Sequence, residues 1–407
     1  MEEDDLVINL ANVQTESIIK VIGVGGGGNN AVGHMFREGQ IEGVRYLVCN
    51  TDRKALEDSP ISEKLQLGEG LGAGGVPERG RKLAEADVEK IRDCMNDGTK
   101  MVFITAGMGG GTGTGAAPVI AREAHNMGLL TVGVVTLPFI FERQKKIEKA
   151  ITGLEEMRKY VDSLIVIVNE RLFEIYNNMS LMDAFKRSDD VLTTAVRSIM
   201  DIINMRGKIL LDFRDVDFVL RNGGISVMTT GYGSGERRLT HAIHEAIHSP
   251  LLNNNNYYRS SRLLMSVTFS DEEEYTLQMS EMKEIDEFMK NFDTHIETKY
   301  GIATDKSLHD KVKVTILASG FMDEEPMEPR SAYKPVNIDA IGKYYGNIGE
   351  NKRPHYQTFI YNLNELDDEE LNGLVDNTST HKRTVQQYNK IMATSKALSE
   401  GTVELDE

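Results

Sequence analysis

The sequence predicts an α/β protein that has a parallel-sheet domain, a long central helix, a second, smaller α/β domain and a flexible C-terminal tail. Apolar runs alternate with helical patterns through the first half, which is the order of βαβ units. A strongly apolar helical pattern follows, and shorter apolar runs then lead into an acidic tail. The boundaries that we expect are 1–16 for a disordered N-terminal segment, 17–187 for the first domain, 188–206 for the helix, 207–321 for the second domain and 322–407 for the tail.

Several runs in the first half are short, apolar and followed by helical segments, as buried parallel strands are. They are Ile18–Val24, Tyr46–Asn50, Met101–Thr105, Leu130–Thr136 and Leu164–Val168. A parallel sheet binds its ligands at the carboxyl ends of its strands. Functional residues are therefore expected directly after these runs.

The central helix and the second domain follow from two further patterns. Apolar residues recur every four positions between Val191 and Ile203, with more apolar residues beside them, so we expect a helix buried between two layers. The second domain is expected to contain strands at Ile225–Thr230, Arg262–Phe269 and Val312–Ala318, and helices at Arg237–His248 and Tyr275–Phe292.

Two glycine-rich loops, Gly23–Asn30 and Gly107–Gly115, each follow a predicted strand and open a helical segment. Without a Cβ, glycine lets the backbone approach an anion, and successive N–H groups form a nest of donors. A helix that begins just beyond the loop adds its N–H groups and its positive dipole end. After the second loop, Ala116-Ala117-Pro118 is expected to open a helix that ends near Gly128. The pair of loops predicts a pocket that grips a polyphosphate from both sides.

The first loop taken alone has two other interpretations. It satisfies G-x-G-x-x-G through Gly23, Gly25 and Gly28. Asp52 follows at about the distance of a ribose-binding acid, which favours a Rossmann-like dinucleotide oxidoreductase. A tight strand-to-helix turn without a ligand is the other interpretation. No Gly-Lys-Ser/Thr follows either loop, so the Walker A motif is excluded.

The second loop carries a resemblance to a known family. Its sequence Gly109-Gly110-Gly111-Thr112-Gly113-Thr114-Gly115 is similar to the signature of the tubulin/FtsZ superfamily, and the chain resembles the FtsZ family from about Ile18 to about Phe321. The matching flanks are Val21 to Val32, Asn50-Thr51-Asp52, Gly70-Leu71-Gly72-Ala73-Gly74, and Pro138-Phe139 with Glu142. The resemblance implies a Rossmann-like GTPase domain and a bacterial cell-division protein that polymerises, hydrolyses GTP with Mg²⁺ and scaffolds a cytoplasmic ring at mid-cell.

The same resemblance assigns the GTP-binding residues. The phosphate contacts fall to Gly26, Gly27, Gly28, Asn29 and Asn30, to Gly72, Ala73 and Gly74, and to Gly109, Gly110, Gly111, Thr112, Gly113 and Thr114. Glu142 and Lys146 are expected at the ribose or phosphates, and Lys146 stands where the family usually has Arg. Asn169 would bond to the base and Phe185 would stack on it. No side chain is assigned to Mg²⁺, which would bind through the GTP phosphates.

Asp189 is the residue expected to read the base. A carboxylate accepts two hydrogen bonds from the N1–H and the amino group of guanine, whereas the unprotonated N1 of adenine would repel it. The alternative is that Asp189 caps the N-terminus of the central helix, where Asp is favoured.

Catalysis is expected from a loop beyond the central helix. The sequence Leu210-Leu211-Asp212-Phe213-Arg214-Asp215 resembles the catalytic loop of the family, with Asp212 and Asp215 as its carboxylates. A helix from Asp189 to Met205 is roughly 24 Å long at 1.5 Å per residue, which would keep these acids away from the GTP of their own subunit. The resemblance implies that they complete the pocket of the next subunit in a head-to-tail filament. A solvated acidic turn is the simpler alternative.

Departures from the family pattern stand beside these matches. Leu210 replaces Asn in the catalytic loop, and the segment Leu67–Gly70 is shorter than its family counterpart near the γ-phosphate. The tail lacks the usual Ile-Pro motif for membrane tethers, because the last proline is Pro354. Division proteins and a membrane tether are therefore expected partners without an identified motif. A GTP-binding structural or regulatory protein with little hydrolysis is the alternative function.

Composition excludes several other classes. A net charge of -17 argues against a nucleic-acid partner. Cys49 and Cys94 are the only cysteines, as in a reduced cytoplasmic protein, and the acidic start Met1–Asp5 is not a secretory signal. The sequence has no run of about 18 apolar residues that could span a membrane.

His244-Glu245-Ala246-Ile247-His248 matches the zinc-protease pattern H-E-x-x-H, but a surface helix carrying histidines is the expected outcome.

Overall fold

The computed structural model describes residues 17–171, 180–204, 207–247, 257–293 and 295–321, together with 344, 369–376, 390–391 and 394–395. The chain divides into two compact units, Met1–Tyr345 and Gly346–Glu407. The expected N-terminal segment 1–16 and most of the expected tail 322–407 lie outside the described residues. In the second unit the structure describes a helix, α13 (Glu369–Asp376), which the sequence analysis does not predict.

The first unit contains a seven-stranded sheet in the order β3-β2-β1-β4-β5-β6-β8, and every strand pair in it is parallel. Its strands are β1 (Ile19–Val24), β2 (Val44–Asn50), β3 (Glu63–Gln66), β4 (Met101–Gly107), β5 (Leu130–Leu137), β6 (Ser163–Val168) and β8 (Gly224–Ile225). The runs predicted in the first half are therefore confirmed as β1, β2, β4, β5 and β6. The sequence gives no signal for β3 because it is a short edge strand in which Leu65 alone is buried.

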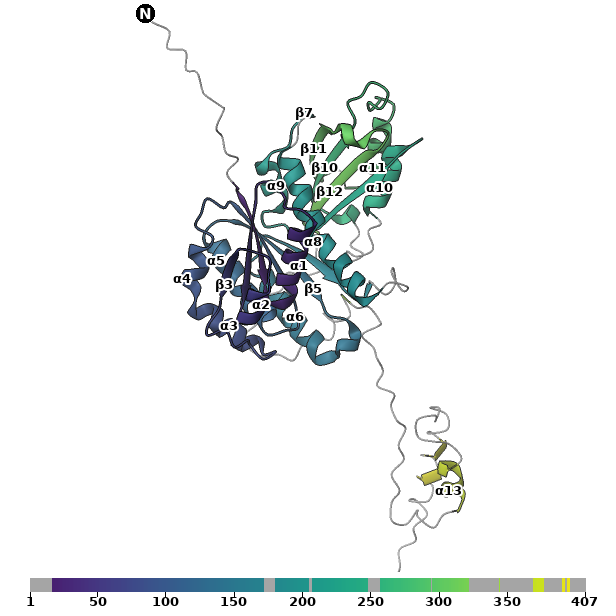
Figure 1. Cartoon of the computed structure of the whole chain (residues 1–407). Helices are drawn as coiled ribbons and strands as arrows, with labels where there is room; N and C mark the ends of the chain where they lie inside the picture. The colour runs from purple at the N-terminus through teal and green to yellow at the C-terminus, as the bar shows by residue number, and fades with distance from the viewer. Residues whose placement is uncertain are drawn as a thin grey trace, which may run out of the picture. The chain divides into compact units, whose positions relative to one another are not determined.

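Helices cover both faces of this sheet. Alternate side chains of a strand point to opposite faces, and both sets are apolar here, so each face needs a covering layer. Ile19 and Val21 of β1 join one apolar core, whereas Ile22 and Val24 join another. The first core is covered by α1 (Gly25–Glu38), by the short α2 (Arg53–Glu57) and by the central helix α8. The second is covered by α3 (Pro77–Ala86), α4 (Val88–Asp93), α5 (Thr112–Asn126) and α6 (Gln144–Arg158), as can be followed in Figure 1.

The central helix α8 (Leu181–Ile203) begins earlier than predicted. Ser180 caps it, since its hydroxyl accepts a hydrogen bond from the Asp183 N–H at 3.2 Å. Asp189 therefore lies inside the helix, and the alternative in which it is the N-cap is wrong. The apolar face of α8 is buried in a core that contains residues of β1 and also of a second sheet. The prediction of a helix between two layers is confirmed.

The second sheet has five strands in the order β7-β11-β10-β12-β9, and it is mixed because β10 and β11 are parallel while the other pairs are antiparallel. Its strands are β7 (Gly207–Ile209), β9 (Val227–Gly233), β10 (Arg262–Phe269), β11 (Glu297–Thr304) and β12 (Val312–Ser319). The predictions for β10 and β12 are confirmed, and the run predicted from Ile225 is divided between β8 and β9. The sequence does not reveal β11, because Gly301 and Ala303 are its only buried residues.

Two helices of the second domain lie next to this sheet. The helix predicted at Arg237–His248 is confirmed as α10 (Arg238–Ile247), while His248 lies outside the described residues. A further helix, α9 (Phe213–Leu220), follows β7 and packs on β10 and β12. Among the helices that the structure describes, none is both long enough and apolar enough to cross a membrane.

The helix predicted at Tyr275–Phe292 is wrong over its first half. The observed helix, α11, spans only Met282–Met289. Before it, the Glu281 carboxylate accepts the Gln278 N–H at 2.7 Å and closes a turn. The apolar spacing extends through this turn, so the sequence pattern alone places the start of the helix too early.

Candidate functional site

The first glycine loop turns directly into α1, with Gly25 as the first helical residue. Gly25 has a φ of 72°, which residues with a Cβ rarely adopt, and a Cβ there would lie 2.8 Å from the amide nitrogen of Gly113. A Cβ on Gly28 would collide with the carbonyl oxygen of Thr105 in β4. Glycine is needed at these positions because the first loop packs backbone to backbone against the second loop and its strand.

The second loop is folded by one of its own threonines. The Gly109 N–H donates to the Thr114 hydroxyl at 2.8 Å, and α5 starts within the loop, at Thr112. The prediction that Ala116-Ala117-Pro118 opens the helix is therefore wrong, because these residues lie inside it. The helix stops before Gly128, which has a φ of 77°, and this confirms the predicted end.

A third loop, Gly72 to Gly75, closes the same region from another side. Gly111 of the second loop packs on it, since a Cβ there would lie 2.8 Å from the Ala73 Cβ. The Thr51 and Thr112 hydroxyls are 2.6 Å apart and join the end of β2 to the second loop. The fold therefore brings together three loops that the sequence presents as separate motifs.

Between these tight contacts, several of the predicted phosphate-binding glycines border open space. A Cβ added to Gly26, Gly72, Gly74 or Gly110 would meet nothing within 4 Å apart from its neighbours in the chain. Backbone N–H groups beside such space can approach an anion closely. The loops therefore combine a rigid frame with room for a chain of phosphates.

Asn29 and Asn30 have different surroundings within the first loop. Asn29 is buried, and with its amide nitrogen facing inward it donates to the carbonyl oxygens of Gly23 at 2.9 Å and Gly25 at 3.0 Å. Asn30 is exposed. The Asn29 side chain therefore stabilises the loop from inside, and only Asn30 presents its side chain to solvent.

The predicted base-binding residues lie after β6 and along α8. Asn169 is buried, and its side-chain oxygen accepts a hydrogen bond from the Ser188 hydroxyl of α8 at 3.1 Å. Phe185 is 38% exposed and stands edge-on to Phe139, with ring centroids 5.5 Å apart. The structure therefore holds the end of β6 and the first half of α8 side by side.

Asp189 is partly buried on α8, close to α1. Burial raises the pKa of its carboxyl to about 7, whereas the nearby cationic groups of His34 and Arg37 act in the opposite direction and Asp190 acts in the same direction. Within the described part of the chain, no group donates a hydrogen bond to Asp189. A partly desolvated carboxylate without donors is poised to accept them from a ligand.

Glu142 and Lys146 lie beside the second loop, at the end of the short helix η2 (Ile140–Glu142) and in the first turn of α6. The two side chains form an ion pair, and Glu142 also accepts the Phe139 N–H at 3.0 Å. Lys146 packs on Gly109, where a Cβ would lie 2.7 Å from the Lys146 Cγ. A bound nucleotide would therefore have to compete with the Glu142–Lys146 ion pair for contacts with these two side chains.

The predicted catalytic acids form the N-terminal cap of α9. Asp212 accepts the N–H groups of Arg214 at 2.8 Å and Asp215 at 3.2 Å, and Asp215 accepts the Asp212 N–H at 3.0 Å. This reciprocal arrangement is a capping box. Both bonds to Asp212 use Oδ1, so Oδ2 of this exposed residue is available to a ligand or a water. The turn is therefore more ordered than a merely solvated acidic turn.

Lys299 of β11 adds a contact to this cap that no sequence motif predicts. Its Nζ lies 2.9 Å from Oδ1 of Asp215. Partial burial acts to raise the pKa of Asp215, but the bonds from Lys299 and from the Asp212 N–H outweigh it and hold this pKa below its ordinary value. No local signal reveals the pair, because β11 enters the chain long after the acidic loop.

The glycine loops and the acidic loop lie at different ends of the first unit. In Figure 1, α9 lies beside the strands of the second sheet, whereas α2, α3 and α6, which border the glycine loops, lie at the opposite side of the first domain. We call these regions the acidic end and the pocket end. Each end exposes large apolar side chains: Leu71 (79%) and Phe141 (56%) at the pocket end, and Leu210 (61%) and Ile209 (47%) at the acidic end. Both ends therefore offer exposed apolar side chains that a contact with another molecule could bury.

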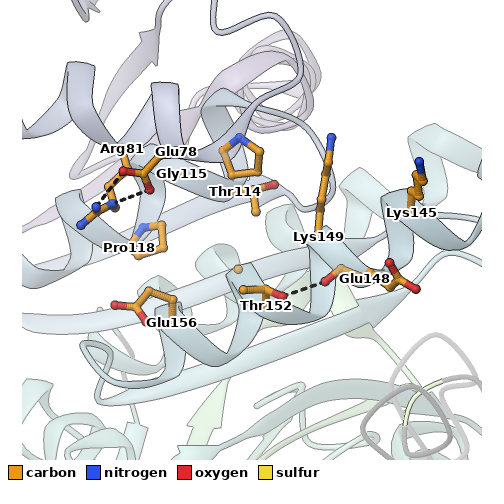
Figure 2. A pocket seen from close by; sticks show the side chains of 12 residues that line it. Glu78, Arg81, Thr114, Gly115, Pro118, Lys145, Glu148, Lys149, Thr152 and Glu156 are labelled. Atoms are coloured by element: carbon orange, nitrogen blue, oxygen red, sulfur yellow. Dashed lines mark hydrogen bonds and ion pairs between the residues drawn. The ribbon is translucent and has the colours of Figure 1, made fainter. Parts of the chain in front are cut away.

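A pocket of about 730 Å³ lies behind the second loop, between α3, α5 and α6. Figure 2 shows that side chains of all three helices line it, among them Arg81 of α3, Thr114 of α5 and Lys149 of α6. Thr114 is the one predicted GTP-binding residue in its lining. This pocket therefore adjoins the candidate nucleotide site and is distinct from it.

The H-E-x-x-H match lies on α10, away from both ends of the site. The Glu245 carboxylate accepts the Tyr232 N–H of β9 at 2.6 Å, so it serves to fasten the helix to the sheet. His244 is exposed, and His248 is not among the residues that the structure describes. The described part of this motif therefore agrees with a surface helix.

Comparison with known proteins relates both domains to one family. Residues 18–177 match the Tubulin/FtsZ family, GTPase domain, and residues 224–322 match the FtsZ family, C-terminal domain. The chain is 43% identical over 410 aligned residues to the cell division protein FtsZ of Porphyromonas gingivalis, covering 94% of this chain and 89% of that protein. It is 42% identical over 351 residues to the cell division protein FtsZ of Buchnera aphidicola, covering 84% of this chain and 90% of that protein.

Solved structures agree with these relationships. An empty FtsZ dimer of M. jannaschii matches with a TM-score of 0.66 and 35% identity, over 79% of this chain and 96% of that one. CetZ of Methanosaeta thermophila matches with a TM-score of 0.63 over 82% of this chain and 92% of that one, and at 18% identity it shows the fold alone. The predicted fold class is confirmed.

Proposed function

This chain belongs to the FtsZ family, and from that premise we propose how its own residues bind GTP and hydrolyse it. The family is tubulin-like and consists of cell-division GTPases that form filaments. The chain is accordingly a GTPase, so the alternative of a dinucleotide oxidoreductase is wrong. The alternative of a family member with little hydrolysis is not favoured by these relationships.

The GTP phosphates would bind in the frame made by the three glycine loops, at residues 26–30, 72–74 and 109–114. Support comes from the interlocked backbone at Gly25, Gly28 and Gly113, which keeps Gly26 and Gly110 beside open space. Both α1 and α5 begin within these loops. Their N–H groups and positive dipole ends would therefore face the bound phosphates.

The guanine base would lie between α8 and the end of β6. Asp189 would accept the N1–H and the amino group of guanine, which would supply the donors that this carboxylate lacks. Phe185, which is partly exposed, would stack on the ring. The oxygen of Asn169 already accepts a hydrogen bond from Ser188, which leaves its amide nitrogen to donate to the base. Glu142 and Lys146 would adjust their ion pair to reach the ribose or a phosphate.

Mg²⁺ would be held chiefly by the GTP phosphates. The three loops, at residues 26–30, 72–74 and 109–114, contain glycine, alanine, threonine and asparagine, and no carboxylate. These residues would therefore leave the ion to be held by the phosphates and by water, with the threonine and asparagine side chains as neutral oxygen ligands. When bound, Mg²⁺ neutralises the negative charge that develops on the phosphates during hydrolysis.

Hydrolysis would require a second subunit. The observation that carries this proposal is that Asp212 and Asp215 cap a helix at the end of the unit opposite to the glycine loops (Figure 1). The free oxygen of Asp212 would orient the water that attacks the γ-phosphate of the neighbouring subunit. Asp215 would act as a positioning residue, held by Lys299 and bonded to the Asp212 N–H.

Head-to-tail stacking would bring the pocket end of one subunit to the acidic end of the next. The apolar side chains exposed at the two ends would then be buried against each other. Such a contact is heterologous and does not close on itself, so it generates a filament. GTP would lie in the contact, and its hydrolysis would weaken the filament. We propose that the filament acts in the cytoplasm at a mid-cell division ring, with other division proteins and a membrane tether as partners and without nucleic acid.

Mixing two inactive variants tests the shared site. Asp189→Ala should lose GTP binding and keep an intact acidic end, whereas Asp212→Ala should keep GTP binding and lose turnover. An equimolar mixture should regain GTPase activity, because the pocket of the second variant can meet the acidic end of the first. Phosphate release at a fixed total protein concentration measures the effect. Asp271→Ala, which removes an exposed acid elsewhere in the second domain, is the matched control and should retain activity alone.

The concentration dependence of wild-type turnover gives an independent test. If two subunits form each site, the rate per molecule should rise with protein concentration and show a threshold. A mixture that is no more active than its parts, together with a rate per molecule that is constant on dilution, would place Asp212 in the site of its own subunit.

A further inference from the structure

Outside the GTP site, one cluster combines side chains that commonly ligate metals. His34 and Glu38 lie one turn apart on α1, and Asp190 faces them from α8. Nε2 of His34 is 2.8 Å from Oδ1 of Asp190 and 3.5 Å from Oε1 of Glu38, and the three ligand atoms lie within 4.8 Å of one another. We propose that this cluster, which we name the α1–α8 clasp, binds a divalent transition-metal ion of the Zn²⁺ class.

The ligand types and their spacing suit such an ion. Imidazole nitrogen and carboxylate oxygen are both ligand types that bind Zn²⁺, and three protein ligands leave the fourth position to a water. Bonds of about 2.0–2.2 Å in tetrahedral geometry place neighbouring ligand atoms roughly 3.3–3.6 Å apart. Of the two separations measured from Nε2 of His34, 3.5 Å falls within this range and 2.8 Å is shorter. Small side-chain rotations would therefore be enough to admit the ion.

The surroundings of the clasp orient its ligands. The side chains of His34 and Asp190 are 13% and 30% exposed, whereas Glu38 is 48% exposed and can move to close the site. Arg187 contacts the other oxygen of Asp190, Oδ2, at 3.4 Å, so Oδ1 is turned toward His34. Without an ion, Nε2 of His34 lies between the two carboxylates. A metal would take the place between them, as metal ligands generally exchange protons for the ion.

The position of the clasp gives the ion a structural consequence. α1 begins in the first glycine loop, and α8 carries Asp189 next to the clasp residue Asp190. A bound ion would cross-link the helix that frames the phosphates to the helix that would read the base. A ligand that binds the folded chain and not the unfolded chain also raises stability. The inference concerns α1 and α8 only, and it stands whether or not Asp212 acts in the neighbouring subunit.

Titration of Zn²⁺ into the nucleotide-free full-length chain tests the clasp by calorimetry, and visible absorption of Co²⁺ gives a spectroscopic signature of coordination. The wild-type chain should bind one ion at this place. His34→Ala and Glu38→Gln should each weaken the affinity by at least tenfold, because even the loss of an outer partner of a metal ligand costs about 10–100-fold. Glu38→Gln keeps the shape of a half-exposed side chain, so its folding should be intact, and circular dichroism checks this.

His244→Ala is the matched control, because it removes an exposed histidine from the H-E-x-x-H match on α10. This variant should bind Zn²⁺ and Co²⁺ as the wild type does. The proposal is overturned if the wild-type chain binds no Zn²⁺, or if Glu38→Gln and His34→Ala both bind like the wild type. It is equally overturned if His244→Ala removes the Co²⁺ absorption, since that result would move the site to α10.

Discussion

At the pocket end, three glycine loops meet backbone to backbone, whereas at the acidic end the side chains of Asp212 and Asp215 set the geometry of an exposed turn. At the pocket end, one added carbon at Gly28 would collide with a strand of the sheet. At the acidic end, carboxylates cap a helix and Lys299 holds one of them from another strand. One half of the proposed site is therefore a frame of main chain, and the other is a network of side chains.

Because of this difference, we expect the two ends to respond differently to substitutions. At the pocket end, a side chain added at an interlocked glycine would collide with backbone. Substitutions at these glycines should therefore alter folding together with binding. A capping box on the surface can lose a charge and keep its shape, so substitutions there should alter chemistry or assembly and change stability only slightly. Leu210, at the position where the resemblance to the family implies Asn, lies at the acidic end, where the chain has this freedom.

The largest expected effect is that of Asp212→Asn, which should reduce GTP turnover at the acidic end and leave GTP binding at the pocket end unchanged. Asn can still cap α9, so the fold and the GTP affinity should remain those of the wild type. Turnover should fall by about a hundredfold or more, in the range of a lost water-orienting base. Steady-state phosphate release and equilibrium binding of GTP measure the two quantities. A parallel loss of GTP affinity would contradict the division of labour between the ends.

A pair of glycine variants should break the frame selectively. Gly28→Ala should lower the free energy of unfolding by about 1–3 kcal/mol, because the new methyl group meets the Thr105 carbonyl. Gly26→Ala adds the same methyl group toward open space and should change stability by less than about 1 kcal/mol. Urea unfolding without nucleotide compares them. Equal losses in the two variants would show that the loops are less tightly interlocked than the structure indicates.

Leu210→Asn should act on assembly. Burial of about half of a Leu side chain in a subunit contact is worth about 1 kcal/mol, which corresponds to a roughly fivefold higher threshold concentration for polymer. Stability of the single chain should not change, because Leu210 is 61% exposed. Sedimentation with GTP, with GDP as the control, measures the threshold. A sharp rise in turnover at an unchanged threshold would instead identify Leu210 as a brake on hydrolysis.

The smallest effect is expected from Lys299→Met and depends on pH. The pKa of Asp215 is lowered in the folded chain, so the Lys299 contact stabilises the fold above the unfolded pKa and is lost as pH falls through the folded pKa. The pair is partly exposed, so the variant should lose less than about 1 kcal/mol at pH 7. The difference from the wild type should shrink toward pH 3. Urea unfolding across this range checks the trend, and a constant difference would contradict it.

Much of the fold could be predicted because its signals are local. The apolar run of β10 and the glycines that end β1 and β4 each mark an element by themselves. The sequence pattern misses strands β3 and β11 because few of their residues are buried, whereas it misplaces three helix boundaries where a single hydrogen bond lies at the boundary. The Thr114 hydroxyl accompanies an earlier start of α5, Ser180 moves the start of α8, and Glu281 delays α11.

The candidate site divides in the same way. Resemblance to a family identifies residues within continuous motifs, such as the second glycine loop. It does not identify pairs that form only when distant segments meet. Lys299 reaches Asp215 from β11, and Asp190 reaches His34 from α8, so neither pair has a sequence signal. Such pairs become visible only when the sheets and helices are assembled.

The burial of α8 in a core shared by both sheets has a mechanical consequence for the proposed polymer. The helix α8 packs against the sheets of both domains, so a small displacement of α8 at the nucleotide would tilt the acidic end relative to the pocket end. In a stacked row these tilts would add from one subunit to the next. The position of α8 between the two sheets would then determine the repeat distance and the curvature of the whole polymer.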